Sequence, residues 1–333
     1  MDWSKGFTTS FYACLVDPVT WTDIERFEIE GGNVNRAETG LRGSADISHA
    51  EFDYGSDKWI RIWMETEQGG AHGKEALFTG MTSVDESEIS GANEIPIECY
   101  SVLKAVDDVD LPRGWYAAKG FKGSEILKRL LSVGPAPVVI QGESARLSQH
   151  IIAEDNETHL TMADSILDAI GWRMFIRGDG TIVAGPPSDE PVHTFGYLQD
   201  DSIELPVKIK HDRFDCPNVL RAMTDDASAV VRDEDPASEL SITERGREVW
   251  HTESSVKLSS GETLFTYAKK RLKELQETAV EMQYDRTFNP EINVSDAIRF
   301  NYPKEGLEGV FRVTSQKIAL DAAGTTSEGV RAI

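Results

Sequence analysis

The sequence predicts a mainly β protein with an α+β insert: two similar antiparallel β-barrel domains plus a smaller α+β domain. Short runs that alternate apolar and polar residues, separated by glycine turns, fill both ends of the chain. Helical spacing of apolar residues appears between them and in one later stretch, and the first β-rich segment has a counterpart near the end. We therefore place the domains at residues 1–104, 105–200 and 201–333, the last with one long helix.

The counterpart segments suggest an internal repeat. The aligned pairs are Phe78 with Phe311, Ile97 with Val330, and Ile60 with Ile298. The first two pairs share a shift of 233 residues and the third has a shift of 238, so the second copy has a loop five residues shorter. Few letters are identical, and chance likeness of two β-rich segments stays open as the alternative.

Residues 1–104 read as β throughout. We expect strands at 10–16, 24–29, 45–48 and 58–64. The last is the clearest, because two tryptophans and an arginine alternate with two isoleucines and a methionine. Many short strands with glycine turns are typical of a barrel or a sandwich.

In residues 105–200 the spacing of apolar residues changes from the period of a strand to that of a helix. Gly123-Ser124 begins a helix with apolar residues on one face, and Gly134-Pro135 closes it. A second helix covers 161–170, with Gly171 as its C-terminal stop. The segments 172–176 and 181–184 then form a hairpin. This alternation predicts the small α+β domain.

Residues 201–333 return to β. We expect strands at 207–210 and 279–287, the latter with Val280, Met282 and Tyr284 on one face. A helix at 262–276 has leucines on one stripe and charges opposite. The polar, acidic segment 225–235 reads as a loop.

Composition limits the classes of partner. The 333 residues carry a net charge of −23, which argues against the basic face that nucleic-acid binding needs and against docking on anionic lipid. No apolar run is long enough to span a bilayer, and the N-terminus has no signal-peptide pattern, so we expect folding in a cytoplasm. Cys14, Cys99 and Cys216 suit buried reduced thiols.

Each motif that suggests chemistry has a simpler structural reading. Arg177-Gly178-Asp179 could serve cell adhesion, but with Gly180 it fits a hairpin turn better. Trp59 and Trp63 could stack sugars, although a barrel wall or a subunit contact also explains them.

The acidic and histidine clusters give no readable site. His150 and His159 near Glu154, Asp155 and Glu157 could bind a cation, and Asp200-Asp201 or the acidic residues of 107–110 could serve as paired carboxylates. With 57 acidic residues such groupings arise by chance. We therefore assign no catalytic, metal or cofactor-binding residue, and we predict no enzyme and no cofactor.

Four stretches resemble the phage tail baseplate hub family, the late control protein D type. They are the strand 59–62 with 77–80; 121–127; 160–167 with 171–176 and the turn 178–180; and 262–275 with Pro290, Asp296, Ile298 and 311–313. The resemblance spans most of the chain. Where such hubs tend to have Gly-Asp before the final strand pair, this chain has Ser295-Asp296.

This resemblance implies a structural protein of the virion, located in the tail baseplate or tip and assembled in the bacterial host cytoplasm. Hubs of this type are homotrimers in which each chain supplies two tail-tube-like barrels. Such a pseudo-sixfold ring adapts a hexameric tail tube to a threefold tip or spike and lets DNA pass during ejection, which suits an acidic inner wall. Further partners would be tape-measure and other baseplate proteins, without sequence-specific nucleic-acid binding and without a membrane span.

Two other functions stay open at this point. A tail-associated peptidoglycan hydrolase or endopeptidase is one, although the chain ends soon after the second β segment and leaves little room for a lytic domain. A tail-tip carbohydrate-binding module is the other, with Trp59 as its contact.

Overall fold

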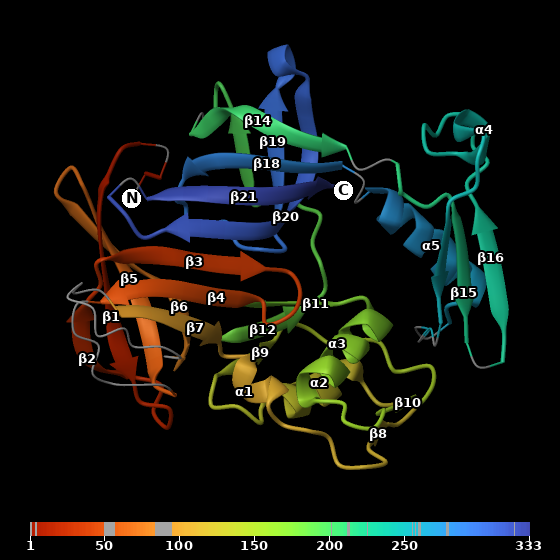
Figure 1. Ribbon diagram of the computed structural model, residues 1–333, viewed down its shortest axis with the longest axis horizontal. Coiled ribbons are helices and arrows are strands. Elements are labelled where there is room, and N and C mark those ends of the chain that lie inside the picture. Colours follow the sequence, from red (N-terminus) through yellow and green to blue (C-terminus); the bar gives the residue numbers. More distant parts are fainter. Residues whose placement is uncertain are drawn as a thin grey trace.

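The computed structural model describes most of the chain. The described residues are 2–3, 5–49, 57–83, 95–200, 202–211, 214–224, 226–254, 256, 258, 261–277, 280–322 and 324–333. Its largest feature is a sheet of 13 strands that takes up both ends of the chain (Figure 1).

The first β unit supplies seven strands of this sheet. They are β1 (Thr8–Val16), β2 (Asp23–Glu28), β3 (Gly31–Ala37), β4 (Gly43–His49), β5 (Trp59–Gln68), β6 (Ala71–Ser83) and β7 (Ile95–Ser101). In β5 the expected alternation is confirmed: Ile60, Ile62 and Met64 are fully buried, because they share the face that packs on the core.

The second β unit supplies the other six strands. They are β13 (His193–Gly196), β14 (Ile203–His211), β18 (Val280–Thr287), β19 (Ala297–Tyr302), β20 (Leu307–Ala319) and β21 (Thr325–Ala332), with the short helix η1 (Pro303–Glu305) at the β19–β20 turn. Its apolar core includes Phe195, Tyr284, Phe300 and Val330.

The two units have one strand order. Neighbours run β3-β4-β7-β6-β5-β1 in the first unit and β14-β18-β21-β20-β19-β13 in the second. The strands also follow one another in the same order along the chain: β1, β3, β4, β5, β6 and β7 correspond to β13, β14, β18, β19, β20 and β21. One pairing differs: β1 is antiparallel to β5, whereas β13 is parallel to β19. The predicted repeat is therefore present as a shared topology.

The strand registers correct the sequence alignment of the repeat. Ile60 pairs with Gly80, and Ile298, its counterpart at the predicted shift of 238, pairs with Phe311. Cys99 pairs with Thr82, as Val330 pairs with Val313. Gly80 to Phe311 and Cys99 to Val330 are both shifts of 231, two fewer than the 233 that we predicted. An even slip keeps the same side chains facing the core, so the periodicity could not detect it.

The described strands do not form two closed barrels. We predicted one barrel per unit, but β20 pairs with β3 as well as with β19 and β21, so the two units share one open sheet. Backbone hydrogen bonds thus bridge the first unit and the second. The mainly β class with an α+β insert is confirmed.

The α+β segment follows β7. It comprises α1 (Lys104–Asp107), β8 (Tyr116–Ala117), α2 (Gly123–Leu131), β9 (Val138–Ile140), β10 (Ile151–Ile152), α3 (His159–Ile170), β11 (Arg173–Ile176) and β12 (Ile182–Gly185). Both predicted helices are present. Thr158 and Thr161 form a capping box at the start of α3, and Gly171 ends it at φ 67°, a conformation that favours glycine.

A second insert lies between β14 and β18, where the first unit has only the β3–β4 turn. It comprises β15 (Val219–Met223), β16 (Ser228–Arg232), α4 (Ile242–Arg245), β17 (Trp250–Glu253) and α5 (Leu264–Glu277). The predicted helix is α5, but the predicted loop 225–235 is wrong, because β16 pairs with β15 there. Val231 on β16 packs against α5, which explains a strand in so acidic a segment.

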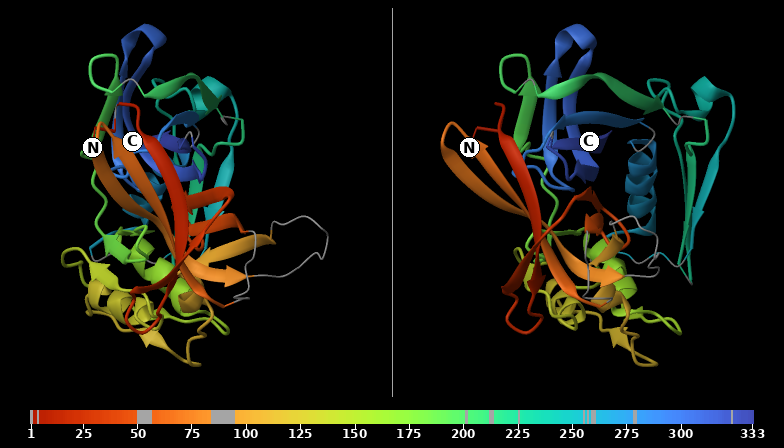
Figure 2. Two further views of the ribbon diagram at one scale, coloured as in Figure 1. Left: turned by 90° about the vertical axis from the view of Figure 1, so that its left-hand side faces the viewer. Right: turned by 60° about the vertical axis from the view of Figure 1, so that its left-hand side comes forward.

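Figures 1 and 2 agree on where the α+β segment and the second insert lie. The α+β segment lies at one end of the shared sheet, and the β15–β17 insert with α5 stands to the side of the second unit (Figures 1 and 2). Among the described residues, no helix has the length and apolar character needed to cross a membrane.

Candidate assembly site: the junction of the two β units

Strand β20 joins the two units because it is long enough to serve both. Its first half pairs with β19, and its second half, from Ser315 to Ala319, pairs antiparallel with β3. Ile318 lies opposite Val34 in this pairing, and both side chains are fully buried. The edge of β3 is thereby closed within one chain.

A buried polar network crosses this junction. Arg286 on β18 and Glu328 on β21 form an ion pair with no exposed side-chain surface. Gln316 on β20 donates to Glu328 over 2.7 Å, and Tyr284 donates to the same carboxylate. From the first unit, Arg36 donates to Gln316 over 3.3 Å and to the backbone carbonyl of Leu77 over 2.7 Å. The two units are thus tied by polar as well as backbone bonds.

The network keeps its charges in spite of burial. Burial disfavours the charged form of Arg286, yet the adjacent Glu328 and Tyr284 raise its pKa. Burial, and then the negative charge of Glu328, raise the pKa of Tyr284. Burial and the positive charge of Arg286 lower the pKa of Arg36 to about 10, so Arg36 stays protonated near neutrality. Arg286 therefore pairs directly with the Glu328 carboxylate, and Arg36 is linked to it through Gln316.

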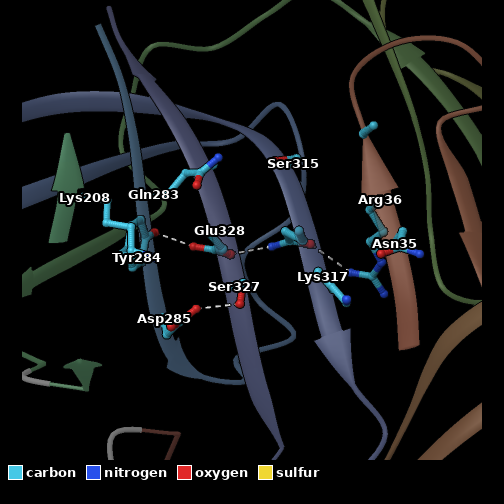
Figure 3. Close-up of a pocket in the computed structure, with 13 residues that line it drawn as sticks. Asn35, Arg36, Lys208, Gln283, Tyr284, Asp285, Ser315, Lys317, Ser327 and Glu328 are labelled. Carbon is cyan, nitrogen blue, oxygen red and sulfur yellow. Dashed lines mark hydrogen bonds between the residues drawn. The ribbon is translucent and has the colours of Figure 1, made fainter. Parts of the chain in front are cut away.

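A shallow hollow lies over this part of the sheet. It has a volume of about 530 Å³ and is lined from β3, β14, β18, β20 and β21 (Figure 3). Its exposed lining side chains include Lys208, Lys317 and Asp285, with Gln283 and Ser327 between them. This hollow therefore carries mixed charge.

Glu38 connects the junction to the α+β segment. Its carboxylate lies 3.2 Å from Arg331 on β21 and 3.6 Å from Arg173 on β11, and its side chain is nearly buried. Arg312 on β20 pairs with Asp189 and donates to the carbonyl of Ser295 over 2.7 Å. Three parts of the chain thus meet through arginines beside the middle of β20.

The hairpin turn 177–180 docks on the first β unit. The hydroxyl of Thr79 donates to the carbonyl of Gly178 over 2.8 Å, and the indole N–H of Trp21 donates to the carbonyl of Asp179 over 2.9 Å. A Cβ on Gly178 would lie 1.7 Å from the carbonyl oxygen of Ala76, so glycine is required for this approach. The hairpin reading of Arg177-Gly178-Asp179 is confirmed, with its backbone turned towards β6.

The tryptophans and histidines of the sequence predictions have structural partners. Trp59 packs against Trp21, with ring centroids 5.5 Å apart, and Lys74 lies 4.0 Å from the ring centre of Trp63. His159 Nδ1 lies 2.8 Å from the carbonyl of Val109. His150 packs against Tyr116. Within the described part of the chain, no three His, Cys, Asp or Glu residues gather as a metal site.

The candidate carboxylates are likewise held by neighbours. Asp107 accepts from Thr158 over 2.9 Å, and Asp108 pairs with Lys104. Asp200 lies 2.8 Å from His193 Nε2, whereas Asp201 lies outside the described residues. Asp107, Asp108 and Asp200 thus each have a structural partner close by.

The sequence reading missed the junction network, although a signal was present. Met282 and Tyr284 were placed on the apolar face of one strand, and Arg286 continues that face at the same period of two. A charged residue on a core-facing position indicates a buried partner. The partners, Glu328 and Gln316, lie in strands whose register the sequence did not give.

Comparison with known proteins adds evidence on the fold. No protein-family model matches the sequence, and no curated protein matches it significantly. Among solved structures, a tail protein from Neisseria meningitidis MC58 is similar over 97% of this chain and 96% of its own, with a TM-score of 0.72 and 14% identity. The 43 kDa tail protein of prophage MuSo2 from Shewanella oneidensis is similar over 97% of this chain and 98% of its own, with a TM-score of 0.68 and 14% identity.

The chain has the fold of phage tail proteins. A more distant similarity points the same way: the E. coli c3393 protein, a component of the type VI secretion system, matches 92% of this chain and 73% of its own, with a TM-score of 0.54 and 9% identity. The suspected likeness to the tail baseplate hub family is confirmed at the level of the fold.

Proposed function

We propose that this tail-protein fold serves as a structural hub: a homotrimeric ring that adapts a hexameric tail tube to a threefold tip or spike. The observation that carries the proposal is the shared six-strand order of the two β units. Three chains would present six similar units, and threefold closure of a duplicated unit gives a pseudo-sixfold wall. The likeness to solved tail proteins supports this role.

The proposed ring belongs in the virion, at the tail baseplate or tip, with the tail tube on one face and the tip protein on the other. The net charge of −23 supports a passage that DNA crosses without adhering, because like charge repels phosphate. In this proposal the barrel forms only on assembly, since one chain holds an open sheet.

We also propose a division of the chain into three domains close to the predicted ones, 1–104, 105–200 and 201–333. Separate hydrophobic clusters support it: one lies within residues 102–184, one gathers mainly first-unit residues and one gathers second-unit residues. Phe195 on β13 packs in the second-unit cluster, which favours a second boundary a few residues before His193.

The role is structural and not enzymatic in this proposal. The carboxylates and tryptophans considered for hydrolysis or sugar binding have the structural partners described above. A zymogram on bacterial cell walls tests this part directly. A lytic band from the purified chain would overturn it.

Mass and imaging measurements test the ring. Light scattering on the purified chain, alone and mixed with a tail tube protein and a tip protein, should show a species three times the chain mass of 36.9 kDa. Particle images should show rings with six similar lobes. A chain that stays monomeric and never joins a ring with these partners would overturn the proposal.

A further inference from the structure

The two β units differ in whether the outer edge of their outer strand is paired. In the first unit, the outer strand β3 is paired on both sides, by β4 and by β20 of the second unit. In the second unit, the counterpart strand β14 is paired with β18 alone among the described residues. An uncovered strand edge presents unpaired backbone N–H and C=O groups that readily take another strand.

The registers make these two strands equivalent residue by residue. Ala45 lies opposite Val34 on one side and Cys99 on the other, as Met282 lies opposite Ile209 and Val330. Because Cys99 and Val330 are counterparts, so are Val34 and Ile209. The position that Ile209 occupies is therefore a core position in the first unit.

The side chains of Val34 and Ile209 differ in exposure because only Val34 is covered by a neighbouring strand. Val34 is 0% exposed because Ile318 on β20 lies opposite it and covers it. Ile209 is 51% exposed. A β-branched apolar side chain on a core-facing position, half open to solvent at an unpaired edge, is what remains when the covering strand comes from elsewhere.

We propose that the open edge of β14 is the surface on which a second copy of this chain docks, by antiparallel strand addition from its first β unit. This inference rests on the proposed ring and names its contact. The junction of β20 with β3 inside the chain is the pattern: the same unit-to-unit contact is made once within each chain and once between neighbouring chains. Three such contacts close the ring.

Charge supports a second copy as the occupant. Residues 1–101 hold 19 acidic and 7 basic residues, while Lys208 is exposed on β14, the strand with the open edge. The acidic first unit of another chain would meet this lysine. Opposite charges at such a contact favour the pairing and its register.

The substitution Ile209→Glu tests the docking edge. It places an acidic side chain on a half-exposed position, so the folded chain tolerates it, but in the assembly the charge would be buried opposite an acidic unit. We expect the dissociation constant of the assembled species to rise about tenfold or more. Ile209→Val, which copies the residue at Val34, should leave assembly unchanged.

The matched control is Ile24→Glu. Ile24 is 66% exposed on β2, the terminal strand at the other end of the same sheet, and the repeat gives it no covering counterpart. This variant should assemble like the parent chain. Equal loss of assembly in both variants, or in neither, would overturn the assignment of the β14 edge.

Hydrogen exchange separates this inference from the proposed function. In the parent chain, the backbone amides of 203–211 should exchange more slowly at concentrations where the assembly forms than after dilution. If no assembly forms, the ring itself fails. If the assembly forms but this segment exchanges equally at both concentrations, the ring stands and the β14 edge is wrong.

Discussion

The two β units follow one strand order but differ in chemistry. The first holds 19 acidic and 7 basic residues over 1–101, whereas the second holds 11 acidic and 8 basic residues over 193–211 and 280–333. A ring built from three chains would therefore alternate strongly acidic and nearly neutral units. In such a ring the backbone would repeat six times and the side chains three times, which is the property that a sixfold-to-threefold adapter requires.

The units also differ in what interrupts them. The outer strands β3 and β4 are joined by a short turn, whereas β14 and β18 are separated by an insert with its own core of Leu220, Val231 and Leu272. The first unit is instead braced from outside, by the hairpin turn at Gly178. The repeat thus preserves the sheet and leaves the connections free to vary, because connections lie at the surface.

The largest expected effect comes from breaking the network that ties the units together. Glu328→Gln leaves the Arg286 guanidinium buried without its counter-charge, and we expect a loss of about 3–5 kcal/mol in the free energy of unfolding. Urea denaturation measures it. Glu308→Gln, an exposed change on β20, is the control and should have little effect.

Replacing both members of the pair sharpens this result. The double variant Arg286→Met with Glu328→Gln removes the uncompensated charge and should recover part of the loss. If Glu328→Gln alone unfolds at the same urea concentration as the parent chain, the junction network does not hold the two units together.

The next effect concerns the hairpin turn at Gly178 that docks on the first unit. Gly178→Ala forces the turn away from β6, because its Cβ would meet the carbonyl oxygen of Ala76. We expect about 2–3 kcal/mol of destabilisation, in the range for steric strain at a closely packed site. Gly6→Ala, where a Cβ meets nothing within 4 Å, is the control. Equal melting temperatures for the two variants would contradict the brace.

Matched truncations test the equivalence of the outer strands. Val34→Ala removes fully buried methyl groups and should cost about 2 kcal/mol in the free energy of unfolding of the isolated chain. Ile209→Ala removes a half-exposed side chain and should cost clearly less there. Denaturation of dilute protein measures both, and an equal cost would show that Ile209 is already covered within one chain.

The sequence predicted the fold where periodicity decides it. The buried face of β5, both α2 and α3, and the existence of a repeat followed from spacing alone. The register of the repeat did not, because a slip of two residues preserves every inward-facing side chain. The strand β16 was missed because a packing contact from α5 outweighed its acidic surroundings.

The assembly site was less accessible than the fold. It depends on which strands lie side by side once distant parts of the chain meet: Ala37 on β3 lies opposite Ser315 on β20, 278 positions later. Arg286 on an apolar face was a readable signal of a buried partner. The exposure of Ile209 was not readable, since its meaning comes only from comparison with Val34 in the folded chain.

The smallest effect is a difference in acid sensitivity confined to the second unit. The nearly buried Asp200 is held by His193 and Ser202, and although burial opposes it, these hydrogen bonds lower the pKa of its carboxyl. A depressed carboxyl pKa stabilises the fold above the unfolded pKa of about 4, and this contribution is lost as pH falls through the lower folded value. Asp200→Asn should therefore show a shallower loss of stability below about pH 4 than the parent chain.

Urea midpoints measured from pH 6 downward check this, with the exposed Glu190→Gln as control. If the midpoints of Asp200→Asn and of the parent chain fall in parallel with pH, Asp200 contributes no acid sensitivity to the second unit.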